Sequence, residues 1–118
     1  MNSEPIRRAT SEDGTLTLGL FDEDDFYLGF QGQAWHTHGD LLVPEYGDSP
    51  ESAAHAFFDS VLADEQVICI SDALAAERSV WITDAPAKEL KYVQLGETLV
   101  MRFWSGRIYD LTVPNEVA

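Results

Sequence analysis

The chain has 118 residues, which suits one compact domain with a single core. It carries 21 acidic and 7 basic residues, so its net charge of −14 argues against nucleic-acid binding, because phosphates would be repelled. Hydrophobic residues make up 45% of the chain, yet no uninterrupted apolar run reaches about 18 residues, so we expect a globular domain that does not span a membrane.

The N-terminal stretch "MNSEPIRRATSEDG" lacks the apolar core of a signal peptide. We therefore expect a cytoplasmic protein in which residues 1–13 and 114–118 are loose ends. Cys69 is the only cysteine, so an internal disulfide is excluded. Its apolar neighbours in "VICI" predict a buried side chain and not a reactive thiol.

The first predicted elements are two strands joined by an acidic turn. "TLTLGLF" and "FYLGFQ" alternate large apolar residues with polar or small ones, which is the pattern of strands with one buried face. Gly29 and Gly32 predict a bulge or a close approach of the backbone in this region. The two strands predict a hairpin. Its four-residue tip consists of Asp22, Glu23, Asp24 and Asp25.

One helix is predicted from about Ser49 to Ala63. Asp48 or Ser49 can cap its N-terminus, and Pro50 suits its first turn. Apolar residues at spacings of three and four form one stripe that should face the core. The stripe consists of Ala54, Phe57, Phe58, Val61 and Leu62. His55 falls on the opposite side, so we expect it to be solvated.

The C-terminal half reads as further strands. "QVICIS" and "SVWITD" predict two strands, joined by a loop or a helical turn at "DALAAER". "APAKELKYVQLGE" is compatible with one helical turn or with a short strand around 91–93. "TLVMRFW" and "RIYDLTV" flank Ser-Gly, which predicts a two-residue hairpin turn. In that register Phe103 opposes Ile108, and Arg102 opposes Tyr109.

The order of these elements predicts the fold class. Hairpins dominate, and strands and helices do not alternate regularly. We therefore expect a single α+β domain over residues 1–118, with a mainly antiparallel sheet and one principal helix on one of its faces. Cys69 and Ile70 should lie beneath that helix.

The stretch "AWHTHGDLL" is the strongest candidate for chemistry. In a strand, His36 and His38 would point the same way and could share a metal, with Asp40 as a third ligand. The metallo-β-lactamase pattern H-x-H-x-D continues with histidine, but here Leu41 follows. Cupins place a glutamate four or five residues after the pair, where this chain has Leu42 and Val43. We therefore expect no metal.

Two other interpretations of this stretch stay open. In the structural one, Trp35 packs at the core edge and Gly39-Asp40 forms a turn. In the other, Trp35, His36 and His38 anchor a partner, because tryptophan is common in interface hot spots. The acidic tip lacks the ligand spacing and glycine of a calcium loop, so it is either a solvated turn or a contact for basic residues.

The whole chain resembles the small acidic immunity proteins of bacterial toxin–immunity systems. The resemblance lies in length, charge, the order of elements and the lack of catalytic motifs, over "FYLGFQGQAWHTHGDLL", "SPESAAHAFFDSVL" and "LVMRFWSGRIYDL". It implies a protein without enzymatic activity or cofactor that binds and blocks a cognate toxin, often a basic nuclease.

Three hypotheses follow: an immunity-type inhibitor, another kind of interaction module, or a small metal-dependent enzyme or ligand-binding protein that uses His36 and His38. The first two predict a basic protein partner, and we expect such a partner on an acidic surface around Trp35. The residues of that predicted surface are Asp22, Glu23, Asp24, Asp25, Trp35, His36, His38, Asp40, Glu45 and Asp48.

Overall fold

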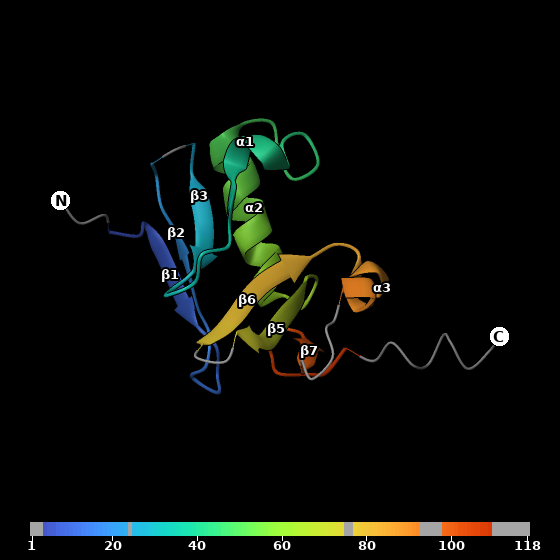
Figure 1. Cartoon of the computed structure of the whole chain (residues 1–118). Coiled ribbons are helices and arrows are strands. Elements are labelled where there is room, and N and C mark those ends of the chain that lie inside the picture. Colours follow the sequence, from blue (N-terminus) through green and yellow to red (C-terminus); the bar gives the residue numbers. More distant parts are fainter. Residues whose placement is uncertain (1–3, 24, 75–76, 93–97, 110–118) are drawn as a thin grey trace.

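Two antiparallel sheets and one long helix make up the fold (Figure 1). The computed structural model describes residues 4–23, 25–74, 77–92 and 98–109. Within these residues the first sheet has the strand order β1-β2-β3-β4 and the second the order β6-β5-β7. The predicted α+β class is confirmed, although the strands are divided between two sheets and do not form one.

The first sheet is built from neighbouring strands joined by short turns. It contains β1 (Arg7–Thr10), β2 (Thr17–Leu20), β3 (Tyr27–Phe30) and β4 (His36–His38). Its inner face carries buried leucine and phenylalanine side chains, which enter the core. The outer face carries the residues between them, so the alternation that predicted β2 and β3 is confirmed.

The helix α2 (Pro50–Leu62) covers the inner face of this sheet. Ser49 caps it, because its hydroxyl accepts from the backbone N–H of Ser52 while the Ser52 hydroxyl meets the backbone N–H of Ser49. Phe57, Phe58 and Val61 are buried as predicted, and Leu62 is half-buried against the core. Figure 1 shows α2 running from the short helix α1 (Gly39–Leu42) toward the second sheet.

The second sheet closes the core from another side. It contains β5 (Val67–Leu74), β6 (Glu77–Thr83) and β7 (Leu99–Arg102), and β6 leads into the short helix α3 (Pro86–Glu89) and the 3₁₀ turn η1 (Leu90–Tyr92). The sheets touch where the Val80 N–H donates to the Gln33 side-chain oxygen at 3.2 Å. No helix within the described ranges is long and apolar enough to cross a membrane.

Cys69 is buried, as predicted, but it does not lie beneath the helix. Ile68 and Ile70 belong to the core cluster, and Cys69 alternates to the other face of β5. Loss of hydration raises the pKa of its thiol to about 12, and Glu89 adds to the shift. This is the behaviour of a small buried apolar side chain and not of a nucleophile.

The connections in the C-terminal half differ from the expectation. The segment 72–78, expected as a loop or helical turn, belongs largely to β5 and β6, which pair as far as Leu74 and Glu77. Residues 86–92 form helical turns, as one of the two alternatives had it. The Val93 end of the strand alternative lies outside the described residues.

The predicted register of the last hairpin is wrong by one residue. Arg102 opposes Ile108, and the Phe103 N–H donates to the Arg107 carbonyl at 2.8 Å. The turn therefore has three residues, Trp104 to Gly106, and not two. Gly106 has φ +100°, the left-handed conformation that closes three-residue hairpin loops. The expected strand beyond Tyr109 lies outside the described residues.

The N-terminal segment is not a loose end, because Arg7–Thr10 form β1 on the edge of the first sheet. The sequence of this strand is mostly polar and lacks the apolar alternation that would have predicted it. The Arg7 guanidinium donates to Asp59 at 2.7 Å and to the ring of His55 at 3.3 Å. His55 is therefore half-buried in this cluster and not simply solvated. Residues 114–118 lie outside the described part.

The turn between β1 and β2 is fastened to β7 by an ion pair. The buried Arg102 donates to Asp13 at 2.7 Å and to the carbonyls of Phe103 and Trp104 at 2.9 Å each. Asp13 also accepts from the Ser11 hydroxyl at 2.6 Å and from the backbone and side chain of Thr15. These hydrogen bonds lower the pKa of Asp13 well below its ordinary value, and the bond from the Ser11 hydroxyl has the largest effect.

This ion pair predicts a pH dependence of stability. The folded chain depresses the pKa of Asp13, so the stabilisation is present above its unfolded pKa near 3.8 and is lost as pH falls toward the folded value. We expect Asp13→Asn to be less stable than wild type near neutral pH, and the difference to shrink as the pH falls below about 4. Urea denaturation at several pH values measures this difference. Asp22→Asn serves as the control, and an equal pH dependence for both variants would contradict the role of Arg102.

Candidate functional site

The acidic hairpin tip lies beside the start of α1. Asp22, Glu23 and Asp25 are exposed between β2 and β3, and Asp24 lies outside the described residues. The Gly39 N–H donates to the carbonyls of Asp25 and Phe26 at 2.9 and 3.0 Å. The tip is thereby held against the residues that follow "WHTH", although the two stretches are separated by a strand and a loop.

His36 and His38 both point from β4 toward the outer face of the first sheet. Their ring centroids are 4.9 Å apart, and both lie near the ring of Tyr27. His36 Nδ1 donates to the Ala34 carbonyl at 3.1 Å. Within the part of the chain that the structure describes, no group of three or more His, Cys, Asp or Glu side chains is arranged to hold a metal.

The arrangement of the histidine pair gives a direct test of the metal hypothesis. Two imidazoles alone leave a zinc ion with half of its usual four ligands. We therefore expect purified protein to contain far less than one equivalent of zinc, iron or nickel by elemental analysis. About one metal per chain, lost in His36→Ala, would contradict this expectation and favour the enzyme hypothesis.

Leu41 is the feature of this region that sequence analysis missed. It is a large apolar side chain on α1 with 70% of its surface exposed. It contributes to two hollows on the surface. The first, of about 320 Å³, is lined by Asp25, His38, Asp40 and Leu41, and we call it the tip hollow.

The second hollow, which we call the side hollow, lies between α1 and the second sheet. It has a volume of about 370 Å³, and Leu41 and Trp35 form part of its wall. The rest of its lining comes from segments before, within and after α2. These residues are Thr37, Leu42, Glu45, Tyr46, Phe57, Gln66, Ile82, Thr83, Asp84 and Glu89.

The two hollows together form a strongly acidic surface around an apolar centre, which we call the Leu41 face. Among the described residues that line it there is no lysine or arginine. Its carboxylates come from three separate segments of the chain. They are Asp25, Asp40, Glu45, Asp84 and Glu89.

The aromatic residues beneath this face are held in place by packing. Trp35 is half-buried against the core, with its ring 6.1 Å from that of Phe30. Tyr46 meets the edge of Phe57 at 5.1 Å, and its hydroxyl accepts a hydrogen bond from Gln66 at 2.8 Å. Rigid aromatic groups under an exposed leucine give a surface that loses little entropy when a partner binds.

The structure brings some of the predicted site residues together and separates others. Asp25, Trp35, His38, Asp40 and Glu45 all line the Leu41 face. Three other described residues of the predicted surface are exposed but do not line either hollow, and His36 lines a different hollow on the outer face of the first sheet. Those three residues are Asp22, Glu23 and Asp48.

Comparison of the chain with protein-family models, with curated proteins and with solved structures found no match.

Proposed function

We propose that this chain is a non-catalytic binding module that holds a basic protein on its Leu41 face. The observation that supports this proposal most strongly is the position of Leu41, an apolar side chain that is 70% exposed among carboxylates. The described residues that line the face include no lysine or arginine. Specific interfaces commonly combine an apolar centre with a polar rim. An arginine or lysine beside an apolar residue is the partner chemistry that complements this arrangement.

The size of the interface bears on which other residues take part. A standard protein–protein interface buries about 1,600 Å² in total, more than two small hollows supply. The exposed tip residues Asp22 and Glu23 and the exposed Asp48 would extend the rim, as the sequence predicted. The immunity-type hypothesis fits these features best, because inhibition of a basic toxin needs only a complementary surface and no reaction.

The test uses any basic protein that is encoded beside this gene, because the immunity hypothesis makes such a protein the candidate partner. Co-expression should restore growth if that protein is toxic, and the two purified proteins should form a complex. Association should slow as salt rises, while dissociation changes less, because charge steers the encounter. If growth is not restored and no complex forms, the proposal is wrong.

A pair of matched charge variants separates the local surface from the net charge. Asp25→Asn with Glu45→Gln neutralises two carboxylates of the Leu41 face, and Glu12→Gln with Glu65→Gln neutralises two exposed ones elsewhere. We expect the first pair to lower the association rate several-fold at low salt, and the second to lower it much less. Stopped-flow kinetics measures both. Equal effects would mean that only the total charge of the chain matters.

A further inference from the structure

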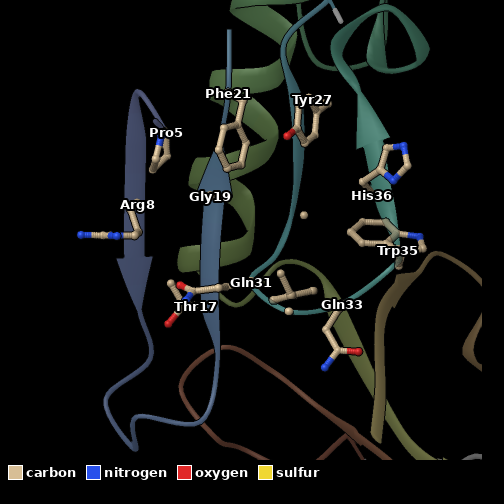
Figure 2. Close-up of a pocket in the computed structure, with 13 residues that line it drawn as sticks. Pro5, Arg8, Thr17, Gly19, Phe21, Tyr27, Gln31, Gln33, Trp35 and His36 are labelled. Atoms are coloured by element: carbon tan, nitrogen blue, oxygen red, sulfur yellow. The ribbon is translucent and has the colours of Figure 1, made fainter. Parts of the chain in front are cut away.

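The outer face of the first sheet carries a row of residues aligned across all of its strands. In the register of the sheet, Arg8 lies opposite Gly19, Gly19 opposite Gly29, and Gly29 opposite His36. The two middle positions of the row therefore have no side chain. A channel runs across β2 and β3, with Arg8 at one end and His36 at the other (Figure 2).

Different neighbours limit the space for a side chain at Gly19 and at Gly29. At Gly29, a Cβ would lie 2.8 Å from the backbone carbonyl oxygen of Trp35, so the close approach of β4 requires glycine there. At Gly19, the nearest obstacle to a Cβ is the Phe21 ring at 3.1 Å, and no backbone atom is close. Glycine weakens the interior of a strand. Packing therefore accounts for glycine at both positions, through β4 at Gly29 and through the Phe21 ring at Gly19, and the hollow is lined by both of them.

Aromatic rings and amides surround the channel and make it a hollow of about 390 Å³. The rings of Phe21 and Tyr27 stack at 4.7 Å with an interplanar angle of 10° and form one wall. Gln31 and Trp35 also line the hollow. Ligand sites are commonly concave, of about 300–1,000 Å³, and lined by aromatic groups with a few polar ones.

The charge of this hollow differs from that of the rest of the chain. None of the described residues that line it is acidic, although the chain has 21 acidic residues. Arg8 is exposed and, within the described part, makes no ion pair. Arg8 lines the hollow, but in Figure 2 its guanidinium points over the free edge of β1, so contact with a bound ligand requires this side chain to rotate. At physiological salt the more distant carboxylates are screened beyond about 8 Å.

The opposite end of the channel has a different polarity. His36 Nδ1 donates to the Ala34 carbonyl, so in the neutral ring Nε2 is the acceptor. That end suits a hydroxyl or N–H donor. Arg8 and His36 are three strands apart, about 14 Å between backbones at ~4.8 Å per strand, which leaves room for a flat ligand between their side chains.

We propose that this hollow binds a small planar aromatic molecule that carries a carboxylate at one end and a hydroxyl at the other. The flat rings lie over Gly19 and Gly29 against the Phe21–Tyr27 stack. The carboxylate pairs with Arg8, and the hydroxyl donates to His36 Nε2. The site does not depend on the proposed protein partner, since apart from Trp35 it shares no lining residue with the Leu41 face.

The probe is 6-hydroxy-2-naphthoate, titrated into ¹⁵N-labelled protein and followed by NMR and calorimetry. We expect saturable shifts of the Gly19 and Gly29 amides and of the Trp35 indole N–H. 2-Naphthol, without the carboxylate, and 2-naphthoate, without the hydroxyl, should each bind more weakly. No saturable shift at millimolar probe, or the largest shifts on the Leu41 face, would overturn the proposal. So would shifts that depend on protein concentration alone, because a second copy would then occupy the face.

Two variants and a control complete the test. Arg8→Gln should weaken binding about tenfold, because a charge-assisted hydrogen bond is lost. Gly19→Val should abolish binding by filling the floor; valine favours the strand conformation, but its Cβ requires the Phe21 ring to shift, so the fold of this variant is checked by its amide spectrum. Lys88→Gln removes an exposed positive charge outside the lining and should bind like wild type. Unchanged binding in Arg8→Gln, whose exposed side chain makes it safe for folding, would by itself overturn the proposal.

Discussion

Phe58→Ala is expected to lower the free energy of unfolding by roughly 3–5 kcal/mol. Phe58 is 2% exposed and belongs to the core cluster that contains leucines of β2 and β3 and isoleucines of β5. Arg7 also covers its ring, with the guanidinium carbon 4.1 Å from the ring centroid. The truncation would thus leave a cavity between both sheets and α2 and remove the surface against which Arg7 packs.

Urea denaturation measures this loss, and Leu41→Ala is the matched control. Leu41 is apolar but 70% exposed, so its truncation should change stability by no more than about 0.5 kcal/mol. A loss of less than about 1 kcal/mol for Phe58→Ala would contradict the position of this ring in the core.

Leu41→Lys is expected to weaken binding of the basic partner by about 100-fold or more. The substitution removes the apolar centre of the Leu41 face and places a positive charge opposite the positive charges of the partner. Like charges in contact cost several kcal/mol, and each 1.4 kcal/mol corresponds to about a tenfold change in affinity. Because the side chain is exposed, the stability of the free protein should be nearly unchanged.

Ile108→Lys is the control for this second prediction. Ile108 is 61% exposed and contributes to neither the tip hollow nor the side hollow. The variant has the same change in charge and apolar surface, so it should bind like wild type in calorimetry or surface plasmon resonance. Equal losses in both variants would show that the effect of Leu41→Lys does not come from its position.

The sequence predicted those elements in which one face is buried over a full repeat. The leucines of β2 and β3 alternate, and the apolar stripe of α2 follows a helical period, so both patterns were readable. β1 was missed because an edge strand of four mostly polar residues has no such pattern. The predicted register of the last hairpin is wrong by one residue, because Ser-Gly is typical of a two-residue turn, whereas here Gly106 ends a three-residue turn.

Sequence analysis could predict only those residues of the candidate site that lie close together in the chain. Trp35, His38, Asp40 and Glu45 follow one another closely, and their mixture of aromatic and acidic residues was a usable signal. Asp84 and Glu89 join them only because the segment that follows β6 lines the same hollow as α1, and no sequence pattern predicts that arrangement. The exposure of Leu41 next to the buried Leu42 likewise depends on how α1 packs against α2.

The most direct test of the Leu41 face is an NMR titration of ¹⁵N-labelled protein with a basic partner, sought first among the proteins encoded beside this gene. We expect the largest amide shifts at Asp25, His38 to Glu45, Asp84 and Glu89, with smaller ones at Asp22, Glu23 and Asp48. A specific complex whose shifts lie instead on β7 or the exposed side of α2, with none around Leu41, would contradict the account.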